Sequence, residues 1–135
     1  MSDWNDKIIE EFRANGGVVG GPFEGAQLLL LHTVGAKTGA ERVNPMMYQA
    51  IPGGYAVFAS KGGAPVNPDW YHNVLAHPKV TAEIGTESVE LLARVAEGDE
   101  REQIWAAQKA AVPQFADYEQ KTARQIPVII LKPIR

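Results

Sequence analysis

The chain has 135 residues, a formal net charge of −3 at pH 7 and no cysteine. This length predicts one domain over residues 1–135, and the lack of cysteine excludes disulfides and thiolate chemistry. The acidic balance argues against a general nucleic-acid binder, which would carry an excess of lysine and arginine.

The N-terminal segment is predicted to form a helix within residues 1–15. Trp4, Ile8 and Phe12 recur at helical spacing, and a pair of glycines after Asn15 ends the pattern. With several acids and no long apolar run, the segment does not read as a signal peptide, and a cytoplasmic location is expected.

Three strands are predicted next, over residues 26–35, 43–51 and 55–60. Residues 36–42 form the first turn, and the Pro-Gly-Gly sequence at 52–54 forms a hairpin turn. Pro45 is expected near the start of its strand or at a sheet edge, because proline cannot donate a ladder hydrogen bond.

The second half continues with a short helix that Asn67 and Pro68 begin and that ends before Pro78. Strands are predicted over 79–85 and 87–96, helices over 98–111 and 114–125, and a last strand over 126–134. Short turns favour antiparallel pairing. The order α-β-β-β-α-β-β-α-α-β therefore predicts an α+β fold around a small barrel or a strongly bent sheet.

The charge is unevenly distributed along the chain. Residues 80–102 are strongly acidic, whereas the charged residues of the segment 33–67 are Lys37, Glu41, Arg42 and Lys61. A cationic segment that lies near glycines on an acidic protein is a candidate anion site. Random clustering on a solvated surface is the alternative.

Two glycine-containing turns stand in this cationic segment. "VGAKTGAER" is not a phosphate-binding P-loop, since Ala36 and Leu31 replace its glycines, but the turn could present Lys37, Thr38 and Arg42 to an anion. In "SKGG", residues 60–63, backbone N–H groups beside a lysine could cradle an anion. An ordinary turn and a flexible strand exit remain the alternatives.

Other catalytic constellations are missing from the sequence. The three histidines lack metal-ligand spacing with carboxylates, and no G-x-S-x-G motif indicates a serine hydrolase. Trp70 and Tyr71 could form an aromatic wall of a binding site against a planar ligand ring, or they could pack in the hydrophobic core. Because the sequence offers no side-chain set suited to difficult chemistry by itself, we expect a cofactor to carry out the reaction.

Three blocks resemble the deazaflavin-dependent nitroreductase family of actinobacteria: "TVGAKTGAERVNP", "ASKGGAPVNPDWYHNVLAHPKV" and "IPVIIL". The resemblance covers about residues 28–133. It implies a split β-barrel related to FMN-binding barrels and an oxidoreductase that uses coenzyme F420, a tricyclic deazaflavin with a phosphate and an anionic oligoglutamate tail. It implies binding of F420 in preference to FMN.

The resemblance also implies which residues bind the cofactor. The phosphate and tail would be held by Lys37, Thr38, Arg42, Ser60, Lys61, Gly62 and Gly63. Asn44, Pro45 and Met46 would lie along the ring system, and Trp70, Tyr71 and Asn73 would close the site. Ala36 stands where many relatives have a basic residue, which puts one tail contact in doubt.

The substrate side is expected in residues 110–120, as a lid with Val112, Phe115 and Tyr118 facing the acceptor. Relatives that activate nitroimidazoles carry more tyrosines there, so a quinone or an activated alkene is the expected hydride acceptor, ahead of a nitroaromatic. Tyr118 and Tyr48 are the candidates for protonating the reduced product.

Two alternatives stay open: a carrier that binds F420, FMN or haem without turnover, and an FMN oxidoreductase of the same fold. A monomer and a homodimer are equally compatible with the sequence. The acids of the first helix disfavour contact with an anionic membrane but leave it open.

Overall fold

The computed structural model describes residues 3–17, 19, 28–60, 67–122 and 125–134. Within these residues the helices and strands follow the predicted order. They are α1 (Asp3–Ala14), β1 (Leu28–Val34), β2 (Glu41–Ile51), β3 (Gly54–Phe58), α2 (Asp69–Ala76), β4 (Lys79–Ile84), β5 (Glu87–Val95), α3 (Gly98–Ala111), α4 (Gln114–Gln120) and β6 (Val128–Pro133).

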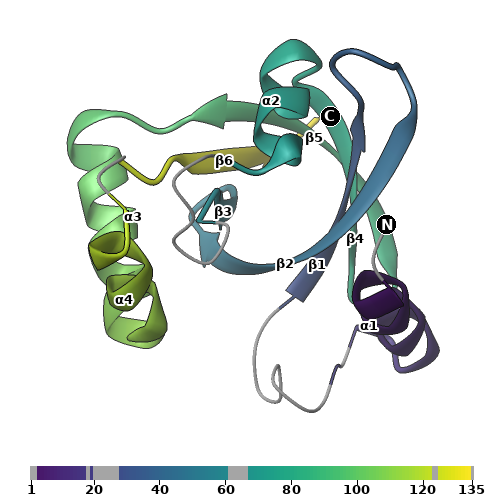
Figure 1. Cartoon of the computed structure of the whole chain (residues 1–135), viewed down its shortest axis with the longest axis horizontal. Helices are drawn as coiled ribbons and strands as arrows, with labels where there is room; N and C mark the ends of the chain where they lie inside the picture. Colours follow the sequence, from purple (N-terminus) through teal and green to yellow (C-terminus); the bar gives the residue numbers. More distant parts are fainter. Residues whose placement is uncertain (1–2, 18, 20–27, 61–66, 123–124, 135) are drawn as a thin grey trace.

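The strands close into an antiparallel barrel in the order β1-β2-β3-β6-β5-β4. This confirms the predicted split-barrel class. Short turns join the pairs β1–β2, β2–β3 and β4–β5, whereas β5 pairs with β6 across the intervening helices α3 and α4. The pairings of β1 with β4 and of β3 with β6 complete the closure. In Figure 1, α2 lies over one end of the barrel, while α1 and the α3–α4 pair lie on opposite flanks.

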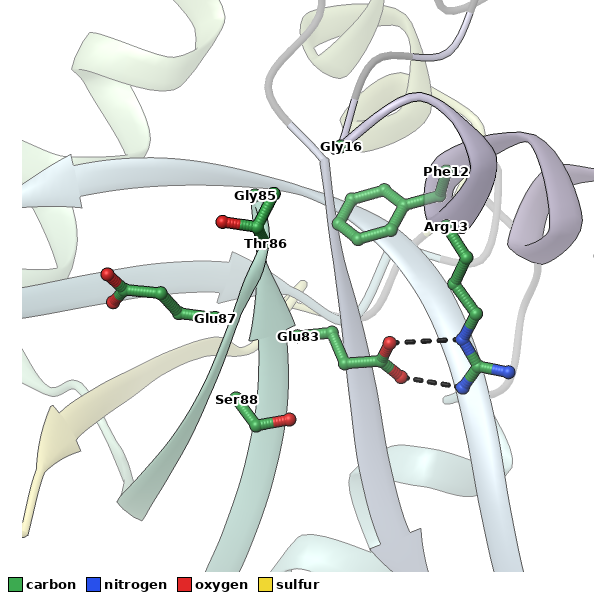
Figure 2. Close-up of a pocket in the computed structure, with 8 residues that line it drawn as sticks. All are labelled: Phe12, Arg13, Gly16, Glu83, Gly85, Thr86, Glu87 and Ser88. Atoms are coloured by element: carbon green, nitrogen blue, oxygen red, sulfur yellow. Dashed lines mark hydrogen bonds and ion pairs between the residues drawn. The ribbon is translucent and has the colours of Figure 1, made fainter.

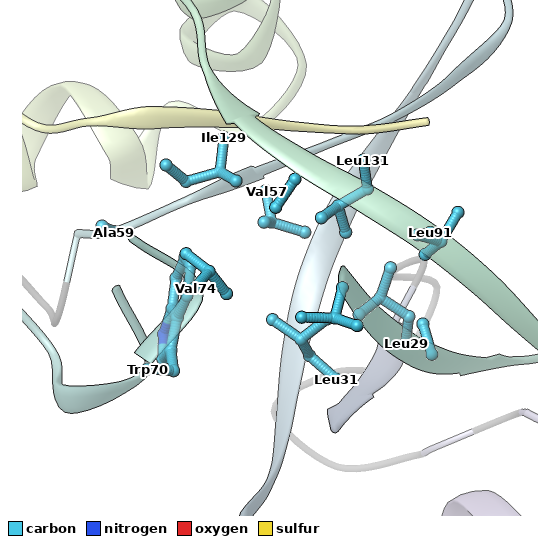
Figure 3. Packing of buried hydrophobic residues seen from close by; sticks show 12 residues of the cluster. Leu29, Leu31, Val57, Ala59, Trp70, Val74, Leu91, Ile129 and Leu131 are labelled. Atoms are coloured by element: carbon cyan, nitrogen blue, oxygen red, sulfur yellow. The ribbon is translucent and has the colours of Figure 1, made fainter. Parts of the chain in front are cut away.

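The strand β1 is buried on both of its faces. Leu29 and Leu31 belong to the cluster that fills the barrel, together with Val57, Leu91 and other apolar side chains (Figure 3). Leu28 and Leu30 point the other way and pack with Ile8 and Phe12 of α1. A strand covered on both sides needs apolar residues at every position, which explains four consecutive leucines where a half-exposed strand would alternate.

The helices α3 and α4 cover the outer face of β3 and β6. Phe58 of β3 meets the rings of Trp105 and Phe115 at centroid distances of 5.9 and 5.5 Å. The indole N–H of Trp105 donates to a carboxylate oxygen of Glu119 at 2.6 Å, which ties α3 to α4. This apolar layer is separated from the barrel interior by the sheet itself.

Two local details differ from or refine the prediction. Pro45 lies five residues into β2, opposite Leu30, where β2 has not yet begun to pair with β3. The missing N–H of proline therefore costs no ladder bond on that open side. Pro68 occupies the position before α2 rather than its first turn, because its ψ of 156° is extended.

A charged contact fastens α1 to the barrel. The Arg13 guanidinium donates to both carboxylate oxygens of Glu83 in β4, at 3.0 and 2.6 Å, beside a hollow of about 200 Å³ at the β4–β5 turn (Figure 2). His32 Nε2 lies 2.7 Å from the same carboxylate, and its Nδ1 lies 3.8 Å from Glu41.

In the part of the chain that the structure describes, no helix is long and apolar enough to cross a membrane.

The Glu83 contact predicts acid sensitivity. Hydrogen bonding by Arg13, and then by His32, holds the pKa of the Glu83 carboxyl below its ordinary value against the opposing effect of burial. Its contribution to stability is therefore present above the pKa of the unfolded chain and is lost as pH falls through the folded pKa. Glu83→Gln should lower the free energy of unfolding at pH 7 and should lose less on acidification to about pH 3 than the wild type does.

Urea unfolding at the two pH values measures both effects. Glu87→Gln, at an exposed carboxylate of the same hollow, is the matched control and should behave as the wild type does. Equal acid losses in wild type and Glu83→Gln would contradict the assignment.

Candidate functional site

A hollow of about 570 Å³ opens between the β1–β2 turn and α2, at the end of the barrel that α2 covers. This volume lies within the range of about 300–1,000 Å³ that is usual for small-molecule sites. Residues of the turn, of the start of β2 and of α2 line it: Gly35, Ala36, Lys37, Thr38, Arg42, Val43, Asn44, Asp69, Trp70, His72 and Asn73.

The turn at residues 35–40 is closed by its own hydrogen bonds. The Gly35 N–H donates to the Ala40 carbonyl at 2.8 Å, and the Gly39 N–H donates to the Gly35 carbonyl at 2.9 Å. The Thr38 hydroxyl accepts from the Ala40 N–H at 3.2 Å. Gly39 adopts a φ of +71°, a conformation that favours glycine. Lys37 is therefore carried on a defined turn.

A buried carboxamide joins this turn to α2. Asn73 is 7% exposed; its Oδ1 accepts from the Ala36 N–H at 3.0 Å, and its Nδ2 donates to the Thr33 hydroxyl at 3.1 Å. Thr33 is itself 2% exposed at the end of β1. Sequence reasoning placed Asn73 at the site but could not find this connection, because its partners lie 37 and 40 positions earlier.

The charge at the hollow is mainly cationic. Lys37 and Arg42 are exposed, and neither forms an ion pair with another described residue. Asp69 and His72 also line the hollow; sequence reasoning assigned neither of them to the site. Their only sequence signal was proximity to Trp70 on the same short helix. Two cations with no described partner beside a hollow suit an anionic ligand.

The register of β2 sorts the other candidates by face. Residues two apart share a face of a strand, so Arg42, Asn44, Met46 and Tyr48 form one row. Met46 and Tyr48 pack against the barrel-filling cluster, which identifies that row as the inner face. Pro45 pairs with Leu30, whose side chain packs on α1, so Pro45 belongs to the opposite face.

The aromatic candidates on α2 have different surroundings. Trp70 is 8% exposed and belongs to the barrel-filling cluster, yet it also lines the hollow. Tyr71 is half-buried against the same cluster and meets the His72 ring edge-on at 5.4 Å. Both readings of Trp70, core packing and a wall of the site, are therefore compatible with its position.

Four candidates belong to the "SKGG" block. Ser60 is half-buried just after β3, and Lys61, Gly62 and Gly63 fall outside the described residues. Among the residues that are described, no three His, Cys, Asp or Glu side chains are grouped so that they could hold a metal ion.

The candidates for the substrate side lie elsewhere. Phe115 is 5% exposed and packs on Phe58 and Trp105, outside the barrel. Tyr118 meets Phe115 at 5.3 Å, and Val112 packs on the same cluster. The structure does not bring these side chains to the hollow that Lys37 lines. Tyr48 and Met46 do not line that hollow either, although they lie on the same strand face as Arg42.

Comparisons with known proteins bear on the family and the fold of the chain. Residues 4–133 match the family model described as F420H(2)-dependent quinone reductase. An F420H(2)-dependent quinone reductase of Mycobacterium tuberculosis is 33% identical over 124 residues, covering 89% of this chain and 83% of the relative.

Two solved structures are similar as well. An F420-H2 dependent reductase, FDR-A, is 43% identical with a TM-score of 0.72, covering 78% of this chain and 94% of the other. A second structure, described as a domain-swapped dimer, is 40% identical with a TM-score of 0.73, covering 94% and 93%.

Gly35 provides a test of the turn. A Cβ at this position would lie 2.6 Å from the Thr38 hydroxyl oxygen and 3.4 Å from the Ala40 carbonyl oxygen. Gly35→Ala should therefore destabilise the protein by about 1–3 kcal/mol, the usual cost of overpacking. Removing the hydroxyl in Gly35→Ala/Thr38→Ala should recover part of that loss. Thermal unfolding of the two single variants and the double variant measures the coupling, and strictly additive effects would contradict the described turn.

Proposed function

Because this chain belongs to the family of F420H(2)-dependent quinone reductases, we propose that it reduces an electron-poor acceptor at the hollow between the β1–β2 turn and α2. The cofactor of this family is coenzyme F420. The acceptor would be a quinone, or an activated alkene, with nitroaromatics less favoured. The observation that carries the proposal is the pair of cations, Lys37 and Arg42, beside Trp70 in a hollow of ligand size.

The described residues fit the chemistry of F420. Its phosphate and oligoglutamate tail are anionic, and Lys37 and Arg42 form no ion pair with a described residue, although Asp69 lines the same hollow. Arginine suits phosphate through its planar fork, whereas lysine acts as a mobile point charge. The apolar part of the ring system would be received by Met46 on the inner face of β2 and by Trp70. Lys61, Gly62 and Gly63 remain proposed contacts, with Ser60 before them.

The reaction needs one proton besides the hydride. When bound, the reduced cofactor supplies a hydride, and the acceptor then requires a proton to complete a two-electron reduction. Burial, with a smaller effect of the neighbouring Tyr55, raises the pKa of the Tyr48 hydroxyl, so this group keeps its proton at neutral pH. Its place in the row with Arg42 and Met46 favours Tyr48 over Tyr118 as donor.

The acceptor is proposed to be flat and apolar. The inner face of β2 and the buried indole of Trp70 offer apolar surface, and each buried Å² contributes about 25 cal/mol. Polar acceptors would need hydrogen bonds that these side chains do not supply. A substrate role for Val112, Phe115 and Tyr118 stays a prediction, because it requires access from the other side of the sheet.

The non-catalytic carrier remains the second candidate. Turnover distinguishes the two: purified protein given reduced F420 and menadione should oxidise F420 catalytically, as followed by its absorbance. Tight F420 binding without turnover of any quinone, enone or nitroaromatic would favour the carrier. Tight binding of FMN or haem without binding of F420 would contradict the cofactor assignment.

The cations should determine cofactor affinity. Lys37→Ala and Arg42→Ala are each expected to raise the Kd for F420 by about 10-fold, the lower end for loss of a charge-assisted hydrogen bond, because both side chains are exposed. Lys61→Ala should have an effect at least as large.

Fluorescence titration at low and high salt provides the measurement, since wild-type affinity should fall with ionic strength. Lys79→Ala, at an exposed lysine outside the hollow, is the matched control. Equal affinities in all four variants would exclude this site.

The proton donor should be separable from binding. Tyr48→Phe is expected to lower kcat with menadione by about 10²-fold, the low end for general acid catalysis, with little change in the Kd for F420. Tyr118→Phe is the matched control and should retain kcat. A larger loss in Tyr118→Phe than in Tyr48→Phe would transfer the role to the α4 side of the sheet.

A further inference from the structure

We propose that Asn73 is a positioning residue: its buried carboxamide does not contact the ligand but fixes the turn that presents Lys37. The resemblance to relatives suggested direct contact with the cofactor. The inference rests on the proposed function only in taking F420 as the ligand whose affinity reports the turn's position.

Both polar atoms of the Asn73 amide are bonded to the protein. Its acceptor atom, Oδ1, is engaged by the Ala36 N–H, and its Nδ2 donates to the Thr33 hydroxyl. Asn73 lines the hollow, but the residue is only 7% exposed, so little of it can be reached from there. A ligand that displaced either bond would leave the Ala36 N–H or the Thr33 hydroxyl without this partner, at a cost, and only the second hydrogen of Nδ2 could be recruited without it.

The bond to Ala36 fixes the turn relative to α2. Three other hydrogen bonds of the turn, which involve Gly35, Thr38, Gly39 and Ala40, stay within residues 35–40 and shape the loop without attaching it. The Ala36 N–H, immediately before Lys37, is held from the helix that carries Trp70. One side chain thereby sets the spacing between a cation and an aromatic wall of the hollow.

The role makes a quantitative prediction. If the free turn occupies the binding-competent position for only a fraction of the time, the apparent Kd rises in inverse proportion to that fraction. Loss of one hydrogen bond corresponds to a factor of up to about 10. Chemistry in the fully bound protein should be almost unaffected, because saturating ligand restores the position of the turn.

Three variants test the role. Asn73→Ala removes both hydrogen bonds of the carboxamide. Thr33→Val removes only the hydroxyl that accepts from Nδ2 and leaves the bond to the Ala36 N–H in place. Val74→Ala removes apolar packing at the neighbouring buried residue of α2. The readouts are amide hydrogen exchange at Ala36 without cofactor, the Kd for F420, and kcat with menadione at saturating reduced F420.

The positioning role predicts a specific pattern. Asn73→Ala should speed exchange at Ala36 and raise the Kd for F420 by about 10-fold, with kcat within about 2-fold of wild type. Thr33→Val and Val74→Ala should keep Ala36 protected and change the Kd much less, even where they cost comparable stability. A purely structural role would instead make the Kd follow stability in all three variants.

Contrary outcomes are distinct. Fast Ala36 exchange in the wild-type protein, or unchanged exchange in Asn73→Ala, would overturn the positioning role without any cofactor present, and the first outcome does not depend on the variant folding. A large loss of kcat at saturation in Asn73→Ala would overturn it too, by indicating direct contact. Wild-type protein that binds no F420 would overturn the proposed function instead, while the exchange readout still decides the role of Asn73.

Discussion

The burial of β1 on both faces is the constraint on which the rest of the structure depends. Leu29 and Leu31 fill the barrel, while Leu28 and Leu30 hold α1 against its outside. A slip of β1 by one residue would exchange leucine for leucine at these positions, but it would also turn His32, on the face of Leu28 and Leu30, toward the barrel interior, which disfavours the slip. Its last residues, and the turn that follows, therefore begin from a well-determined place.

The candidate site uses that fixed end. Thr33, still inside the barrel wall, gives Asn73 a buried partner, and Asn73 in turn holds the backbone just before Lys37. The pairing of Thr33 with Arg42 places the second cation beside the same end of β1. Binding groups are thus carried by a turn and a helix end, while the barrel beneath them supplies rigidity. This division is common where loops bear function on a stable scaffold.

The sequence predicted the order of elements because its signals are local. Leucine runs, glycine turns and helical spacing each act over a few residues, and every predicted element from α1 to β6 is present. Barrel closure depends on β1–β4 and β3–β6 pairs between distant segments, so only the fold class could be anticipated. Likewise, Lys37 and Arg42 were found from charge and glycine, but the bond between Asn73 and Ala36 leaves no local trace. The inward row on β2 also needed the register, which separates Pro45 from Met46.

The central claim is that F420 binds between the β1–β2 turn and α2. Backbone and indole N–H resonances of isotope-labelled protein, titrated with F420, test it most directly. We expect the largest shifts at Ala36, Lys37 and the Trp70 indole, with residues 85–88 beside the Arg13–Glu83 contact unchanged. Shifts confined to residues 85–88, or to α3 and α4, would contradict the account.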